Sequence, residues 1–279
     1  IHYEFLTSPA RVTDVGPAAY VHRVTDVRRG AARAMIPIAL ALLATAAKTP
    51  RNILFVLQDD GGYNGLGYMN ERLHPGKPKL HTPRLDALAA DAVKLTQFYV
   101  LPLCSPTRSA FLTGRYPLRL GTQATNPDWG KPWGLDLGER FIGQSLQAAG
   151  MTTALFGKWH VGMHTNGSLP NARGFDEFEG FLTGGLTHFT HSTAVYSYPP
   201  SKAFPRGCHK CVEGYDWHRQ RNGVLELALD RNMTYSSHAV RDATVDFIQR
   251  QYLRQDGGGG SAKPWFVYAA FQTVHEPLE

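Results

Sequence analysis

The sequence predicts an α/β fold with a mainly parallel or mixed central sheet flanked by helices. The first observation is that short apolar runs recur along the chain, as expected of strands buried on both faces. The second is that helical patterns separate these runs, which favours parallel strands joined by helices. The third is composition: 43% hydrophobic and 19% charged residues argue against a disordered chain. A chain of 279 residues can bury a core without disulfides, and three cysteines are too few for a disulfide scaffold.

Four elements are expected in the first half of the chain. Residues 52–58 are a continuous apolar run and predict a buried strand. Thr82 and Pro83 open a helix, with threonine as N-cap and proline in the first turn. The apolar face of this helix is expected to consist of Leu85, Leu88 and Ala89. Residues 93–100 are interpreted as another strand, and a helix is expected around Pro106.

The second half of the chain alternates in the same way. We expect a helix over 139–149, a short strand over 152–156 and a long loop-like stretch over 157–234. A second helix is expected over 236–252 and a buried strand over 265–271. Gly150 stands where a C-terminal cap of the first helix belongs. Gly257–Gly260 predicts a flexible surface loop. One side of the second helix is expected to carry Val240, Ala243, Phe247 and Ile248.

The N-terminal region resembles a targeting segment. Arg28, Arg29 and Arg33 precede an apolar run over 35–43, and residues 44–46 form a small-x-small cleavage pattern. We therefore interpret residues 1–47 as an N-terminal extension and signal peptide, and residues 48–279 as the part that folds. The alternative is a buried N-terminal helix. The apolar run is well below the ~20 residues of a membrane span, so no membrane span is expected.

A signal peptide would send the protein into the secretory pathway, with a lysosomal or extracellular destination. Two N-glycosylation sequons, at Asn166 and Asn232, agree with that compartment. The chain carries 29 Lys+Arg against 23 Asp+Glu, but no basic run of the kind that binds nucleic acid. We expect no nucleic-acid partner, and the mild positive charge is compatible with an anionic substrate.

Polar clusters follow the predicted strands, where ligands of α/β folds bind. Asp59 and Asp60 end the first strand, and their mutual repulsion would be relieved by a hard divalent cation with oxygen ligands. A solvated turn is the alternative. Cys104 precedes Pro106 at a helix N-terminus, which favours an anion, and Arg108 lies four residues on, along the same face.

Two further clusters combine cations with imidazoles. Lys158 and His160 follow the strand at 152–156, and in an extended segment they share a face while Trp159 points the other way. A cation beside an imidazole suits a tetrahedral anion and a proton transfer. His275 follows the last predicted strand and stands two residues before Pro277.

These clusters carry a resemblance to a known family. Cys104-x-Pro106-x-Arg108, followed by Leu-Thr-Gly-Arg at 112–115, resembles the sulfatase signature. Gly-Lys-Trp-His at 157–160 resembles the family's second signature, and the order Asp-Asp, Cys-x-Pro-x-Arg, Gly-Lys-Trp-His, His-x-Pro is that of the family. The resemblance runs from about residue 52 to residue 279. It implies an alkaline-phosphatase-like sulfatase fold, with residues 48–279 as the N-terminal part of the sulfatase catalytic domain. The His-x-Pro string looks most like the arylsulfatase B branch.

The resemblance implies a mechanism. The formylglycine-generating enzyme of the secretory pathway would oxidise Cys104 to 3-oxoalanine (formylglycine), whose hydrate attacks the sulfate ester and later expels sulfate. Asp59, Asp60 and the modified residue 104 would bind Ca2+, and Arg108 would hold the hydrate in place. Lys158 would neutralise the sulfate. His160 would hydrogen-bond the hydrate and take its proton. His275 would contact the sulfate and protonate the leaving oxygen.

The same resemblance implies the substrate and a departure. A sulfated carbohydrate or aryl sulfate is expected, with N-acetylgalactosamine 4-sulfate in glycosaminoglycans suggested by the arylsulfatase B likeness. Family members carry a further Asp-Asn metal pair and a second lysine nearer the C-terminus, beyond Glu279. We therefore interpret the chain as an N-terminal fragment, incomplete at its C-terminus, with weak or absent activity and an exposed apolar edge.

Other interpretations stay open. A phosphomonoester or phosphonate hydrolase of the same superfamily, or a non-catalytic binder of sulfated glycans, would share much of this pattern. Cys208 and Cys211 form a Cys-x-x-Cys pair in the loop-like stretch. A local disulfide is preferred there over a zinc or redox site, because further metal ligands and a βαβ context are absent.

Overall fold

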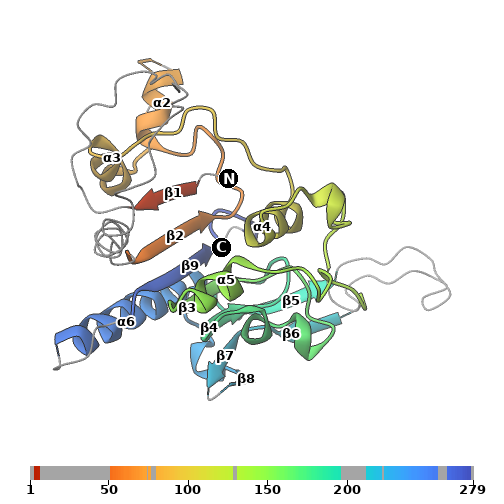
Figure 1. Ribbon diagram of the computed structural model, residues 1–279. Helices are drawn as coiled ribbons and strands as arrows, with labels where there is room; N and C mark the ends of the chain where they lie inside the picture. The colour runs from red at the N-terminus through yellow and green to blue at the C-terminus, as the bar shows by residue number, and fades with distance from the viewer. Residues whose placement is uncertain are drawn as a thin grey trace, which may run out of the picture. The chain divides into compact units, whose positions relative to one another are not determined.

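The computed structural model describes residues 3–6, 51–73, 75–76, 80–127, 131–195, 212–221, 223–256 and 263–277 (Figure 1). Residues 1–6 and 52–279 form one compact unit. Of the expected N-terminal extension and signal peptide at 1–47, only residues 3–6 are described. The glycine loop at 257–260, and Cys208 and Cys211, lie outside the described residues. None of the helices that are described is both long enough and apolar enough to cross a membrane.

A seven-stranded mixed sheet forms the centre of the fold, in the order β1-β2-β9-β3-β4-β7-β8. The inner neighbours β2, β9, β3 and β4 are parallel, whereas β1, β7 and β8 add antiparallel edges. The α/β class with a mixed, helix-flanked sheet is therefore confirmed. The strands of this sheet are β1 (Tyr3–Leu6), β2 (Ile53–Gln58), β3 (Thr152–Lys158), β4 (Glu177–Phe181), β7 (His218–Arg221), β8 (Val224–Leu227) and β9 (Trp265–Phe271).

The central strands are apolar on both faces because each face is covered by helices. Phe266 and Tyr268 of β9 belong to one core cluster with Phe55, while Val267 and Ala269 belong to a second cluster. This alternation follows from the two-residue period of a strand. The helices α4 (Cys104–Thr113) and α5 (Ile142–Ala148) contribute to the first cluster, and α6 (Ser236–Asp256) contributes to the second.

Helix α6 agrees with its sequence pattern. Val240, Ala243 and Phe247 are buried in the second cluster, and Ile248 packs against it. The helix contacts β9, β3 and β4, and Figure 1 shows it running along the sheet beside β9. The expected apolar side and the position of the helix are therefore confirmed.

Two expectations in the first half are wrong. Residues 93–100 form no strand, and Val93 and Tyr99 are 89% and 81% exposed, because no described strand pairs with this segment. Helix α3 (Pro83–Ala90) begins at Pro83 as expected but buries only Ala89 of its expected apolar face. The unexpected α2 (Gly67–Leu73) lies against α3, where Thr82 Oγ1 accepts a hydrogen bond from Gly67 N.

The second half has more regular structure than its sequence predicts. Helix α5 starts at Ile142 rather than Glu139, and Gly150 after it has a left-handed φ of 86°, as expected of a C-terminal cap. Strand β3 runs two residues further, to Lys158. The stretch at 157–234 contains β4, β7 and β8. It also contains a two-stranded sheet of β5 (Ser192–Val195) and β6 (Val212–Tyr215). Short 3-10 helices occur at Pro117–Arg119, Asn166–Ser168, Pro170–Arg173 and Leu229–Arg231.

Candidate active site

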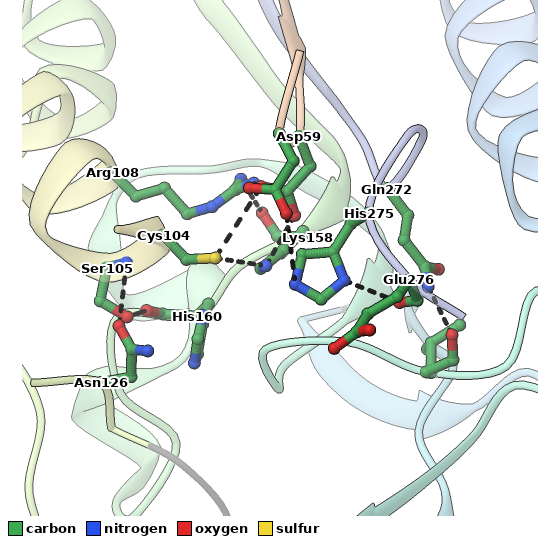
Figure 2. A network of polar contacts seen from close by, with 12 residues as sticks. Asp59, Cys104, Ser105, Arg108, Asn126, Lys158, His160, Gln272, His275 and Glu276 are labelled. Carbon is green, nitrogen blue, oxygen red and sulfur yellow. Dashed lines mark hydrogen bonds and ion pairs between the residues drawn. The ribbon is translucent and has the colours of Figure 1, made fainter. Parts of the chain in front are cut away.

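The predicted polar clusters meet at the carboxyl edge of the parallel strands. Asp59 follows β2, Lys158 is the last residue of β3, and His275 lies in the loop after β9. Cys104 is the first residue of α4, so the N-terminus of that helix faces the same point. Figure 2 shows these four side chains converging. Because parallel strands end at one edge of a sheet, residues more than 200 positions apart in sequence become neighbours.

A buried carboxylate lies at the centre of this cluster. Asp59 is fully buried and forms ion pairs with two cations. Its Oδ2 lies 2.6 Å from Lys158 Nζ, and its Oδ1 lies 3.3 Å from Arg108 Nη2. Burial raises the pKa of Asp59, but the charges of Arg108 and Lys158 outweigh burial and lower it from 3.8 to about 2. Asp59 is therefore ionised at any physiological pH.

The thiol of Cys104 lies within this charged environment. Its Sγ is 3.1 Å from Lys158 Nζ and 3.9 Å from Asp59 Oδ1. Burial raises the pKa of Cys104, but hydrogen bonds with His160 and His275 and the charge of Lys158 lower it from 9.0 to about 5. A helix N-terminus favours the same anionic form. The site therefore stabilises negative charge at the side chain of residue 104.

His275 faces Cys104 from the loop after β9. Its pKa is raised, chiefly by the hydrogen bond with Cys104. Its Nδ1 lies 2.7 Å from the carbonyl oxygen of Glu276, and its Nε2 lies 4.0 Å from Asp60 Oδ2. The Asp60 side chain is 56% exposed, so Asp60 stands at the solvent side of the cluster while Asp59 stands at its base.

The imidazoles of His160 and His275 each lie against one glycine of a Gly-Gly pair. A Cβ atom at Gly184 would lie 2.6 Å from His160 Cε1, and one at Gly185 would lie 3.1 Å from His275 Cε1. The Gly-Gly pair after β4 therefore lets the backbone approach both imidazoles. His160 and Asp60 have left-handed φ values of 54° and 55°, a strained conformation that is typical of functional sites.

Arg108 is held below the site by buried partners. Its Nη1 donates to Tyr268 Oη at 3.0 Å and to the carbonyl oxygen of Lys158 at 3.2 Å. Burial raises the pKa of Tyr268 to about 12, so its hydroxyl stays neutral and accepts from the guanidinium. Arg108 thereby connects β9 and β3 with Asp59.

The neighbours of these residues fix their direction. Trp159 points away from the site, as expected, and its Nε1 donates to Gly162 O at 2.8 Å and to Ser168 O at 3.1 Å. Ser105 Oγ donates to the carbonyl oxygen of His160 at 2.7 Å, and Ser105 N donates to Asn126 Oδ1 at 3.2 Å. Figure 2 shows Asn126 beside Ser105 and His160. These bonds join the start of α4 to the end of β3.

The structure places Asp59, Cys104 and His275 as a possible metal-binding group. One ligand atom from each lies within 4.8 Å of the other two. Asp60, which the sequence pairs with Asp59 as a ligand, is not a member of this group, whereas His275 is. A carboxylate suits a hard cation, whereas a thiol and an imidazole suit softer metals.

Several residues around the site are not evident from the sequence. Tyr268 is hidden within the apolar run of β9, where an aromatic residue is expected to serve the core. Gly184 and Gly185 follow β4, a strand that the sequence did not indicate, although a Gly-Gly pair is itself a signal of a special backbone. Asn126 carries no signal, because its contact with Ser105 depends on the tertiary fold.

Comparison with known proteins gives a family for this chain. A family model described as "Sulfatase" matches residues 51–279. Human arylsulfatase A is 36% identical over 262 residues, covering 89% of this chain and 45% of that protein. Human N-acetylgalactosamine-6-sulfatase is 37% identical over 249 residues, covering 84% and 41%. Mouse arylsulfatase J is 32% identical over 239 residues, covering 84% and 34%. The chain thus spans less than half the length of these curated relatives.

Solved structures give the same fold. The crystal structure of Ps i-CgsB matches with a TM-score of 0.63 and 30% identity, covering 83% of this chain and 47% of that chain. The same protein in complex with k-i-k-neocarrahexaose matches with a TM-score of 0.62 and 28% identity, with the same coverage. The sulfatase PsFucS1 from Pseudoalteromonas sp. matches with a TM-score of 0.56 and 25% identity, covering 85% and 46%.

Proposed function

Because this chain belongs to the sulfatase family, we propose that it carries the catalytic centre of a sulfuric ester hydrolase. The observation that supports this most directly is the position of Cys104 Sγ, 3.1 Å from Lys158 Nζ at the edge where Asp59, Arg108 and His275 meet. Cationic donors around one reacting side chain suit the charge of a sulfate group in the transition state. The likeness to the arylsulfatase B branch stays a prediction.

We propose that Cys104 acts after oxidation to formylglycine by the formylglycine-generating enzyme. In this two-electron oxidation one C–H bond and the C–S bond at Cβ break and a C=O bond forms. The sulfur leaves as hydrogen sulfide, and the maturation enzyme would use molecular oxygen as the oxidant. When hydrated, the aldehyde supplies one hydroxyl as nucleophile and a second hydroxyl for the release of sulfate. The surroundings of residue 104 fit an oxygen anion, because they already lower the pKa of a thiol there to about 5.

We propose Ca2+ as the metal of the complete protein, held in part by Asp59 and Asp60. The buried, ionised carboxylate of Asp59 fits a hard cation, and Asp60 adds a second carboxylate from the next residue. Ca2+ takes about six to eight oxygen ligands, so these two residues and an oxygen at position 104 would form only part of its shell. The ion would add positive charge where the sulfate ester binds.

The remaining residues are proposed to bind sulfate or to move protons. Lys158 Nζ, next to the reacting side chain, would bind a sulfate oxygen. Arg108 would orient residue 104 through Asp59, to which it is paired at 3.3 Å. His160 would accept a proton from the hydrate during sulfate release. His275, with its raised pKa, would donate a proton to the leaving oxygen.

We propose a sulfated carbohydrate as the natural substrate, with aryl sulfates as convenient surrogates. One of the relatives above is named an arylsulfatase, and another is named an N-acetylgalactosamine-6-sulfatase. The arylsulfatase B likeness of the His-x-Pro string favours the 4-sulfate of the same sugar. A comparison of the 4- and 6-sulfates of N-acetylgalactosamine would separate these two.

We propose that the protein matures in the secretory pathway, with a lysosomal or extracellular destination. Asn166 and Asn232, the acceptor residues of the two sequons, are both exposed and are proposed to carry N-glycans. Enzymatic removal of N-glycans from protein made in a eukaryotic host should lower its apparent mass. The variants Asn166→Gln and Asn232→Gln should each carry one glycan fewer, so each should lose less mass in this treatment than the wild type.

The experiment that tests the function is a paired substrate assay. The protein containing this chain is expressed in a eukaryotic secretory host and assayed with 4-nitrophenyl sulfate and 4-nitrophenyl phosphate. We expect hydrolysis of the sulfate in preference to the phosphate, and loss of sulfate hydrolysis in Cys104→Ala. Preference for the phosphate, or full sulfate turnover by Cys104→Ala, would contradict the proposal.

A further inference from the structure

A cavity of about 420 Å³ is lined by residues that have no role in the mechanism above. Its size falls within the range of about 300–1,000 Å³ that is usual for ligand pockets. Its lining combines apolar side chains with a cation, a carboxylate and two imidazoles, and includes Met163, Leu182, Lys131, Asp216, His164 and His218.

Two residues of the lining are hydrogen-bonded to segments that carry or adjoin the proposed catalytic residues. The carbonyl oxygen of Leu182 accepts a hydrogen bond from His160 N at 3.1 Å. On the other wall, Lys131 Nζ donates to the carbonyl oxygen of Asn126 at 3.2 Å, and the Asn126 side chain accepts from Ser105 N. Ser105 is the neighbour of Cys104 in the chain. The two lining residues therefore belong to segments that are held against His160 and against the chain neighbour of Cys104.

Asp216 serves as a support within the cavity wall rather than as a free charge. It is 1% exposed and accepts hydrogen bonds from Leu182 N, Thr183 N and Thr183 Oγ1. It also pairs with His218 Nε2 at 3.0 Å. These donors compensate its negative charge, and the pairing leaves Nδ1 of His218 as the ring nitrogen for a ligand.

We propose that this cavity is a subsite for a second sugar residue with an acidic substituent, next to the sugar whose sulfate ester is cleaved. The inference rests on the proposed function. Met163 and Leu182 would pack against the C–H face of a pyranose ring, as apolar walls do in saccharide sites. Lys131 would form a charge-assisted hydrogen bond with a sulfate or carboxylate of that ring. The imidazoles of His164 and His218 would bind its hydroxyl groups.

The test compares an oligosaccharide with a small substrate in the same enzyme. A tetrasaccharide of chondroitin 4-sulfate is used as a competitor of 4-nitrophenyl sulfate hydrolysis, so that Ki is measurable whether or not the tetrasaccharide is cleaved. Lys131→Ala is expected to raise the ratio of tetrasaccharide Ki to aryl sulfate KM about tenfold, because the variant loses one charge-assisted hydrogen bond to the tetrasaccharide. His218→Ala should raise it in the same direction.

Lys263→Ala is the matched control. Lys263 is exposed and precedes β9 at the opposite, amino end of the strands, so the ratio should equal that of the wild type. A carboxyl-reduced tetrasaccharide identifies the acidic group: a raised Ki assigns it as a carboxylate, and an unchanged Ki assigns it as a sulfate. An equal ratio in wild type, Lys131→Ala and Lys263→Ala would overturn the subsite while the sulfatase proposal stood.

Failure of the proposed function has a different outcome. If the mature protein hydrolyses no sulfate ester, the function fails, and the subsite is then judged by calorimetric binding of the tetrasaccharide. Weaker binding by Lys131→Ala than by Lys263→Ala would still support a saccharide site at the cavity. Equal binding of the tetrasaccharide by both variants would contradict the proposed subsite.

Discussion

The charge state of Cys104 is set by residues from three other elements of the fold. Lys158 comes from β3, His160 from the segment just after it, and His275 from the loop after β9. Burial alone would keep the thiol protonated, but these three neighbours together lower its pKa to about 5. The same donors would face the oxygens of a sulfate ester at this position.

This charge environment can be measured on protein that keeps its thiol, made in a host without the maturation enzyme. Because the pKa is lowered, the thiolate should persist as pH falls from 8 to 6 and be lost near pH 5. Alkylation by iodoacetamide, followed by mass spectrometry of the Cys104 peptide, should have its midpoint near pH 5. Lys158→Met should move the midpoint upward. A midpoint at the ordinary thiol pKa of 9.0 in the native protein would contradict this environment.

His275 is proposed to protonate the leaving oxygen, and this role predicts a dependence on the leaving group. His275→Gln should lower kcat for a sugar sulfate about 100- to 10,000-fold, the range for general acid catalysis. The loss should be much smaller for 4-nitrophenyl sulfate, since nitrophenolate leaves without a proton. His81→Gln, at an exposed position, is the control and should change neither rate. Equal losses on both substrates would point to a structural role of His275 instead.

The candidate residues could be selected from sequence because each stands at a boundary that sequence reveals. Asp59 directly follows an apolar run, His275 lies four residues beyond the end of another, and Cys104 precedes a proline suited to a helix start. Their distances could not be predicted, since these depend on the strand order β2-β9-β3. The same limit explains why His275 rather than Asp60 joins Asp59 and Cys104 in the possible metal group.

At the scale of elements, strands buried on both faces were the most predictable. β2, β3 and β9 are apolar runs, and their packing between two cores requires that composition. The β7–β8 hairpin was missed because its side chains are largely polar. Arg219 of β7 pairs with Glu179 of β4 at 2.6 Å, a contact with no periodic signature in sequence. Residues 93–100 were predicted as a strand but form none, because an apolar segment forms a strand only where it can pair with another strand.

Helix α6 provides a test of the second core. Phe247 is fully buried, and its ring lies 6.0 Å from that of Phe156 and 6.2 Å from that of Trp265. Phe247→Ala should destabilise the protein by about 3–5 kcal/mol, the usual cost of such a cavity. Tyr252→Ala on the same helix is 61% exposed and should cost about 0.5 kcal/mol or less. Urea unfolding checks both, and equal midpoints for the two variants would contradict the packing of α6.

At the scale of the whole molecule, the described unit brings together residues that the sequence separates widely. The interval from Asp59 to His275 spans nearly the entire unit, and β9 must insert between β2 and β3 before the site exists. The backbone also joins the two loops, since Asp59 N donates to Thr273 O at 3.1 Å and Val274 N donates to Asp59 O at 2.7 Å. Formation of the site is therefore coupled to completion of the central sheet.

The most direct measurement concerns the side chain of residue 104 itself. The protein is expressed in a eukaryotic secretory host in which a known sulfatase is matured, and the peptide containing Cys104 is analysed by mass spectrometry. An aldehyde at this position, detected by its mass and by its reaction with a hydrazide, is the predicted result. An intact thiol in that peptide, while the known sulfatase from the same cells carries the aldehyde, would contradict the assignment of a formylglycine-dependent hydrolase.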